Sequence, residues 1–158
     1  MGEEKIVARE TLASLLEDAP GVRAVSPRIG FGTAIYRDGR TYRARALGVD
    51  FRREAAYQNL EKILAAGRLP RDGEREVLVA GGLAREMGIS AGDKITLLAQ
   101  TRGRGSNAVT LTAVGLAEFP VASFNSGFLM LPLDRAEGLL PMEGFATEIL
   151  VKLEPGTD

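Results

Sequence analysis

The sequence contains no histidine, no cysteine and no tryptophan. Without His or Cys there is no ordinary zinc site, no thiol nucleophile, no Ser-His-Asp triad and no haem ligation through His. Carboxylates alone favour calcium or magnesium, but the acidic residues do not show the spacing of a calcium loop. The four lysines lie in no recognisable catalytic motif. We therefore expect a protein without enzymatic activity, metal or cofactor.

Long apolar runs and an excess of one charge are also missing. The longest uncharged stretch, 119–133, contains two prolines and several polar residues, and it is shorter than the roughly 20 residues of a membrane span. The acidic N-terminus is unlike a signal peptide. Twenty basic and 21 acidic residues give a net charge of −1, which does not favour a nucleic-acid partner. The 158 residues suffice for one globular domain or two small lobes.

The clearest local signal is a β-hairpin. Alternating apolar residues predict strands over 22–36 and 41–48, and Asp38-Gly39 between them is typical of a two-residue turn. The resulting register places Ile35 opposite Tyr42 on an apolar face and Arg43 and Arg45 on the other face. A slip by one residue would bury the arginines, so the register is well defined.

The remaining segments alternate between short helices and short strands, which predicts an α+β fold. Asp50 is placed to cap the helix over 51–57, and Glu54 lies in its first turn. The predicted helices are 5–18, 51–57, 60–66, 83–87 and 133–140, and the predicted strands, besides the hairpin, are 76–80, 95–101, 109–116, 128–131 and 146–153. The segment 119–127 is predicted to be an apolar but irregular loop.

The Gly103–Ala108 segment fits the G-x-G-x-x-G/A pattern of dinucleotide-binding proteins. That fingerprint must open a helix after a strand, whereas here it precedes an alternating strand-like run. We interpret it as a hairpin turn.

Two features are candidate partner-binding sites. Five arginines concentrate positive charge near the first hairpin, which indicates either a docking face for an acidic partner or an ordinary solvated sheet face: Arg28, Arg43, Arg45, Arg52 and Arg53. The loop at 119–127 carries Phe119 and Phe124, and it forms either a binding lip or a cover for the core. The partner-binding candidates are Arg43, Arg45, Phe119 and Phe124.

Several segments, in order over nearly the whole chain, resemble the extracytoplasmic domain of MacB-type and LolC/LolE-type ABC transporter permeases, the FtsX-like superfamily. The matching segments are 21–28, 47–50, 67–70, 76–80, 83–89, 91–97, 111–116 and 130–140.

The resemblance implies a domain on the outer side of the bacterial cell membrane, between two membrane helices of a permease. It implies a porter-like lobe built from residues 1–70 and 127–158, with a smaller sabre-like lobe, residues 71–126, inserted between them. It also implies that the chain is a piece of a longer protein. Such domains carry ATP-driven helix motion to a substrate or partner protein, and their partners are a second permease subunit and cytoplasmic ATP-binding subunits.

One departure from the family bears on function. LolC-like members hook a lipoprotein carrier with a long loop between the two middle strands, whereas the corresponding segment here is only 102–107. Carrier docking is therefore not carried over, and lipoprotein release, export and cell-wall regulation stay open. The alternative is a stand-alone ligand-binding or DNA-binding module, because 88–95 also resembles the turn-strand element of small double-psi barrels.

Overall fold

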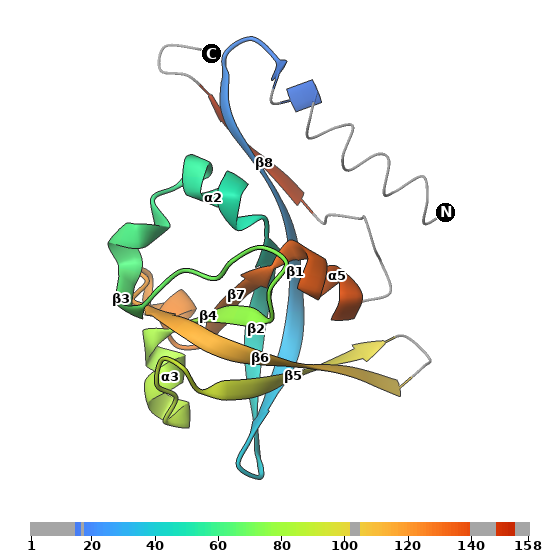
Figure 1. Ribbon diagram of the computed structural model, residues 1–158, viewed down its shortest axis with the longest axis vertical. Coiled ribbons are helices and arrows are strands. Elements are labelled where there is room, and N and C mark those ends of the chain that lie inside the picture. The colour runs from blue at the N-terminus through green and yellow to red at the C-terminus, as the bar shows by residue number, and fades with distance from the viewer. Residues whose placement is uncertain (1–14, 17, 102–104, 140–147, 154–158) are drawn as a thin grey trace.

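The computed structural model describes residues 15, 16, 18–101, 105–139 and 148–153, and shows an α+β fold as predicted (Figure 1). No helix among these residues is long and apolar enough to cross a membrane. The elements in chain order are β1 (Val22–Arg37), β2 (Arg40–Val49), α2 (Phe51–Tyr57), the 3-10 helix η1 (Leu60–Ile63), β3 (Leu64–Gly67), β4 (Glu76–Ala80), α3 (Gly81–Met87), β5 (Lys94–Thr101), β6 (Gly105–Ala117), α4 (Ala122–Asn125), β7 (Phe128–Pro132), α5 (Leu133–Leu139) and β8 (Glu148–Leu153).

The first hairpin forms as the sequence predicts. Asp38 and Gly39 have φ angles of 50° and 79°, as a two-residue turn with two left-handed residues requires. Ile35 pairs with Tyr42, and Phe31 pairs with Ala46. The predicted register is therefore confirmed.

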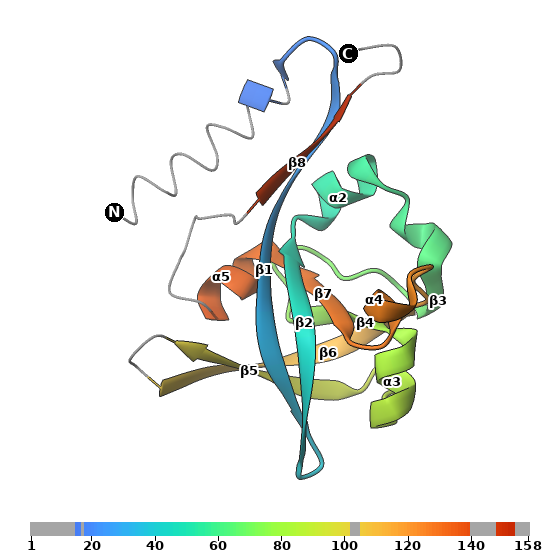
Figure 2. The ribbon, with the colours of Figure 1, turned by 180° about the vertical axis from the view of Figure 1, so that it is seen from behind.

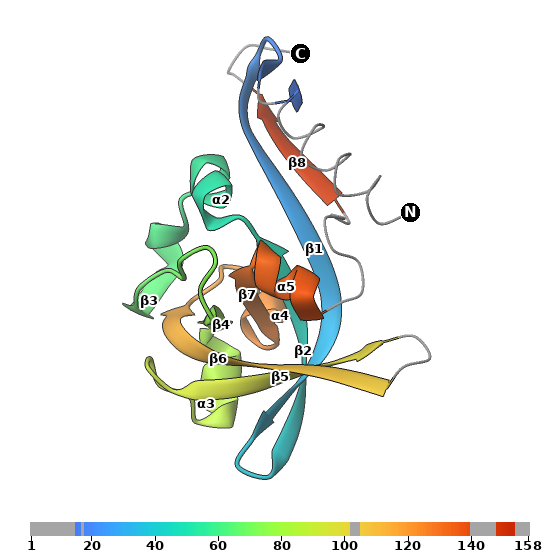
Figure 3. The same ribbon diagram turned by 45° about the vertical axis from the view of Figure 1, so that its right-hand side comes forward.

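Six of the strands close into a mixed β-barrel. Around the barrel the order is β1, β2, β7, β4, β6 and β5, with β5 returning to β1. The β2–β7 and β4–β6 pairs are parallel, and the other pairs of the barrel are antiparallel. Figure 3 shows the β5–β6 hairpin crossing the β1–β2 hairpin at a steep angle. Outside the barrel, β3 pairs with β6 and β8 pairs with β1.

The barrel interior is the main hydrophobic core. It combines inward residues of β1 with those of β4, β5, β6 and β7, and α5 packs into it through Leu133, Ala136 and Leu139. Helix α5 lies so close to β2 that a Cβ on Gly48 would overlap the Cβ of Ala136. The glycine therefore sets the distance between helix and strand.

A second, smaller core lies on the outer side of the barrel. Phe51 of α2 and Leu60 of η1 cover Val49, Leu78 and Met130, which project outward from three neighbouring strands.

Two carboxylates accept hydrogen bonds from the backbone at the start of α2. Asp50 accepts a hydrogen bond from the Arg53 backbone N at 3.1 Å, and Asp72 accepts one from the Phe51 backbone N at 2.7 Å. The predicted cap at Asp50 is confirmed.

Residues 71–126 share the barrel with the flanking segments. Within 71–126, β5 and β6 pair at eight positions, and within the flanks β1 and β2 pair at ten. Between them, β1 pairs with β5 at three positions, β4 with β7 at two and β3 with β6 at three. The sheet is continuous across the two predicted lobes, while its shortest ladders lie between them. The division into lobes stays a prediction.

One predicted helix is wrong. The sequence predicts a helix over 60–66, where Leu, Ala, Glu and Lys are residues with high helix propensity. Only Leu60–Ile63 forms a turn of 3-10 helix, and Leu64–Gly67 pairs with the edge of β6. Gly67 has a φ of 73°, and a Cβ there would overlap the Val114 carbonyl. Backbone pairing at this edge overrides the helix propensity. The predicted helix over 5–18 lies almost wholly outside the described residues.

Candidate functional site

The structure separates the five arginines that the sequence grouped together. Arg43 and Arg45 are exposed on the outer face of β2. Arg28 lies at the base of α2, where it binds Glu54. Arg52 and Arg53 line a cleft beside the start of α2. The hypothesis of one positive docking face made of all five arginines is therefore wrong, because Arg28 binds Glu54 and the side chains of Arg52 and Arg53 line a separate cleft.

Arg45 and Phe119 are brought to the same part of the surface. Arg45 pairs with Phe128 across β2 and β7, and its backbone N donates to the Gly127 carbonyl at 2.8 Å. The rings of Phe128 and Phe119 meet edge to face, with centroids 5.3 Å apart and an interplanar angle of 84°. Phe119 is half-buried and packs against both cores. Phe124 belongs to α4, and its side chain lies outside the described ones.

Hydrogen bonds fix the loop that carries these aromatics. Asn125 Oδ1 accepts from the Phe119 backbone N at 3.0 Å, and Asn125 Nδ2 donates to Glu118 Oε2 at 2.8 Å. Glu118 Oε1 in turn accepts from Arg85 Nη1. The hydrogen bond from Arg85 holds the pKa of Glu118 below its usual value, with Asn125 adding to the effect. Gly82 of α3 lies against the Asn125 carbonyl, so the loop is anchored to α3 as well.

A buried ion pair joins α2 to β1. The Glu54 side chain is fully buried, and its partner Arg28 is only 14% exposed. Arg28 Nε donates to Glu54 Oε1 at 3.0 Å, Gln58 Nε2 donates to Glu54 Oε2 at 2.6 Å, and the Ser26 hydroxyl also donates to Oε1. The sequence predicts Glu54 as a first-turn acid and Arg28 as part of either a docking face or a solvated sheet face, and neither prediction includes this pair. Burying a carboxylate is unfavourable unless it is paired with an opposite charge and hydrogen-bonded, as Glu54 is.

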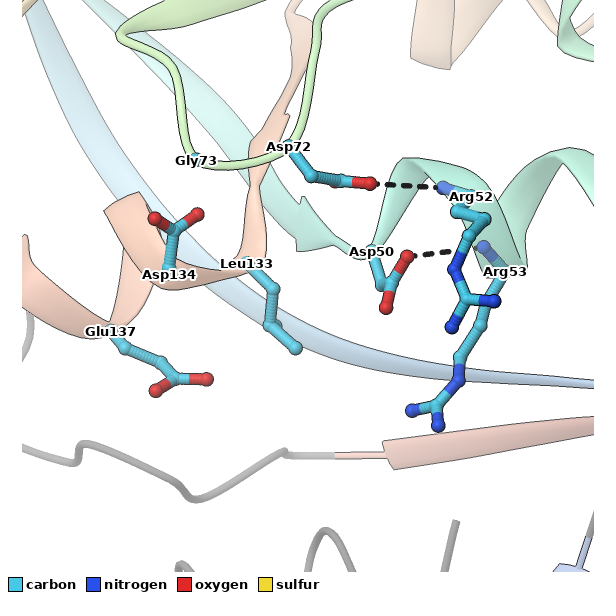
Figure 4. Close-up of a pocket in the computed structure, with 8 residues that line it drawn as sticks. All are labelled: Asp50, Arg52, Arg53, Asp72, Gly73, Leu133, Asp134 and Glu137. Carbon is cyan, nitrogen blue, oxygen red and sulfur yellow. Dashed lines mark hydrogen bonds between the residues drawn. The ribbon is translucent and has the colours of Figure 1, made fainter. Parts of the chain in front are cut away.

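Two polar clefts also lie on the surface of the described residues. The first, about 320 Å³, is lined by four carboxylates and two arginines (Figure 4): Asp50, Asp72, Asp134, Glu137, Arg52 and Arg53. Burial raises the pKa of Asp72 above its usual value, although two backbone hydrogen bonds oppose that rise. The second, about 440 Å³, lies between the β1–β2 turn and α3. Among the described residues no three acidic side chains are arranged to hold a metal ion.

The glycine-rich segment is part of the β5–β6 hairpin. Thr101 pairs with Gly105, and the ladder continues from there along both strands. Residues 102–104 lie outside the described ones. No helix opens after the segment, so a dinucleotide fingerprint is excluded and the expected hairpin is confirmed. Its second strand begins at Gly105, inside the segment expected to be the turn.

Comparison with known proteins identifies the family. Residues 4–158 match the MacB-like periplasmic core domain. The chain belongs to that family. No curated protein matches the sequence.

Solved structures share the fold. The chain resembles the extracellular domain of the noncanonic ABC-type transporter YknZ from Gram-positive bacteria, with a TM-score of 0.68, 14% identity and coverage of 99% of this chain and 74% of that one. It also resembles the periplasmic region of MacB from Actinobacillus actinomycetemcomitans, with a TM-score of 0.69, 13% identity and coverage of 94% of this chain and 66% of that one. A domain of a putative permease protein from Porphyromonas gingivalis gives a TM-score of 0.61 at 24% identity, with 92% of this chain and 62% of that one covered. The chain thus spans between 62% and 74% of the length of these structures.

The family match gives the cellular location of the domain and the class of protein to which it belongs. It is the extracytoplasmic domain of a MacB-like ABC transporter permease, a non-catalytic part of a transporter that has partner subunits. The family match favours this assignment over the alternative of a stand-alone ligand-binding or DNA-binding module. The segment that suggested it, 88–95, leads into β5 of the barrel.

Proposed function

We propose that this domain transmits ATP-driven movement of the permease's membrane helices to a substrate or partner protein outside the membrane. The main support for the proposal is that β1, a single strand of 16 residues, takes part in two different strand pairings. Its first half pairs with β8, and its second half pairs with β2 in the barrel wall. A displacement of the β1–β8 ribbon therefore reaches the barrel through one continuous backbone.

The ribbon is a suitable point of entry for movement. Val22 at the start of β1 pairs with Leu153 at the end of β8, so the first and last described strands are adjacent and antiparallel. Figures 1 and 2 show this ribbon extending beyond the barrel. Two strands linked by a ladder of hydrogen bonds resist shear, so both ends of the ribbon move together.

The junction between ribbon and barrel is stiffened at one residue. Arg28 pairs with Glu148 of β8 and with Val49 of β2, so both ladders meet there. The side chain of Arg28 binds the buried Glu54 of α2. Helix α2 braces β1 at the point where a long strand would otherwise bend.

The same proposal covers the partners and the lobes. The membrane helices join the domain to cytoplasmic ATP-binding subunits, and a second permease subunit moves with it. The short ladders between 71–126 and its flanks support a division into porter-like and sabre-like lobes. The proposal is compatible with two classes of cargo, an exported substrate or a released lipoprotein.

Distance measurement in the assembled transporter tests the proposal. Arg23 on the ribbon and Asp38 at the β1–β2 turn are both exposed, and this chain has no native cysteine. Spin labels on Arg23→Cys and Asp38→Cys in one subunit report movement within the domain. Labels on Asp38→Cys in both permease subunits report movement between domains.

On trapping the transporter with ATP, we expect the distance within the domain to stay constant and the distance between domains to shift by several ångströms, about the scale of other rigid-body switches. An unchanged distance between domains would contradict the proposal. A change confined to the distance within one domain would show internal rearrangement instead of rigid transmission.

A further inference from the structure

One part of the barrel surface combines two arginines with an exposed apolar loop. We call it the arginine–loop surface and define it by Gly32, Ala34, Arg43, Arg45, Pro120, Val121 and Ala122. Strand β7 links its two halves, because Phe128 pairs with Arg45 and packs against Phe119 at the start of the loop. In Figure 2, α4 lies at the start of β7, which runs beside β2.

The apolar half is exposed and held in place. Val121 is 50% exposed and is one of four large exposed hydrophobic residues among those described. The loop around it is closed by the Asn125 backbone N, which donates to the Val121 carbonyl at 3.1 Å, and by the Asn125 side chain. A fixed apolar side chain loses little conformational entropy when a partner covers it.

The polar half carries charge of one sign only. Arg43 and Arg45 are exposed, and neither has an ion-pair partner among the described residues. Arg45 Nη2 would lie 3.3 Å from a Cβ on Gly30, so its guanidinium extends over β1. Small residues on β1, including the exposed Gly32, leave room for it. Glu118, the carboxylate next to the loop in sequence, is already bound to Arg85 and Asn125.

Resting on the proposed function, we propose that this surface docks an extracytoplasmic partner protein through a segment in which an apolar side chain is flanked by carboxylates. Carboxylates would complement Arg43 and Arg45, which have no ion-pair partner among the described residues. An apolar side chain would pack against the exposed Val121. Opposite charges on such surfaces raise the rate of encounter and suppress wrong partners.

Photo-crosslinking in cells tests the proposal on the full-length permease. A photoreactive phenylalanine analogue replaces Val121, and in a control strain it replaces Leu153, which is 46% exposed but lies on β8. We expect the Val121 probe to capture one protein at an acidic segment, identified by mass spectrometry, and the Leu153 probe not to capture it.

Charge reversal decides whether the surface acts as proposed. With Arg43→Glu and Arg45→Glu together, the yield of the adduct should fall about tenfold, a typical electrostatic effect on association rate. Arg23→Glu, an exposed arginine on the ribbon, is the matched control and should leave the yield unchanged. Replacing the captured carboxylates by lysine should restore the adduct of the doubly reversed variant.

Four results would overturn the proposal: an adduct with a second copy of this chain, an adduct with lipid only, no adduct, or an adduct insensitive to charge reversal. The spin-label distances of the doubly reversed variant separate this test from that of the proposed function. If they still shift with ATP while the adduct is absent, docking at this surface fails and transmission stands. If the adduct forms but no distance shifts, transmission fails.

Discussion

Replacing Glu54 by alanine should destabilise the domain by about 3–5 kcal/mol, because removing one member of a buried ion pair takes away the charge that offsets the desolvation of the other. The Glu54 side chain is fully buried and receives hydrogen bonds from Arg28, Ser26 and Gln58. Its loss leaves a guanidinium that is 14% exposed facing an empty site, together with an unpaired hydroxyl.

Urea unfolding followed by the circular dichroism of the sheet measures this loss. With a urea slope of about 2 kcal/mol per molar, a loss of 4 kcal/mol lowers the midpoint by about 2 M. Replacing both partners, with Arg28→Met and Glu54→Leu, should be less damaging than Glu54→Ala alone, because no charge is then left buried.

The matched control for Glu54 is Glu118, a carboxylate that also binds an arginine and an amide but lies exposed. Glu118→Ala should not shift the urea midpoint measurably, since exposed ion pairs contribute little. If Glu54→Ala were as stable as Glu118→Ala, or if the double replacement were the less stable variant, the reasoning about the junction would be refuted.

Two further predictions concern packing and pH. Gly48→Val should destabilise the domain by about 1–3 kcal/mol through overpacking against Ala136, whereas Gly127→Ala, which enters open space, should have no comparable effect on the urea midpoint. Hydrogen bonds from Arg68 hold the pKa of Glu76 below its usual value of 4.5. The contribution of the Arg68–Glu76 interaction to folding stability is present above the pKa of Glu76 in the unfolded chain. It is lost as the pH falls through the lower pKa of the folded state. Glu76→Gln should therefore flatten the fall in urea midpoint over that acid range, and an unchanged slope would contradict the prediction.

Local features were predictable because neighbouring residues determine them. Asp38 and Gly39 fix the turn, and the alternation on either side fixes the register of ten paired positions. Asp50 is followed by a helix whose third backbone N–H it can reach, so the cap was evident as well. In each case the partners lie within a few residues or on two adjacent strands.

The long-range features were missed for the opposite reason. Arg28 and Glu54 are 26 residues apart, and no local pattern shows that α2 folds back onto β1. The pairing of Leu64–Gly67 with β6 depends on a strand some 50 residues later in the sequence, and a propensity for helix cannot reveal it. The proximity of Arg45 to Phe119 likewise required the parallel pairing of β2 with β7.

The barrel itself bears on how the domain can move. Two of the ladders between 71–126 and its flanks are short, but their paired residues are deeply buried: Ile35 opposite Leu97, and Val79 opposite Leu129, each with no exposed surface. Opening either ladder would expose large apolar side chains at a cost of about 1.5–3 kcal/mol each. Breaking the three pairs of β1 with β5 would add unpaired backbone groups to that cost. Movement of the whole barrel through β1 avoids both costs. The stiffness of the junction at Arg28, more than any opening of the barrel, should therefore govern how far a displacement of the ribbon is carried.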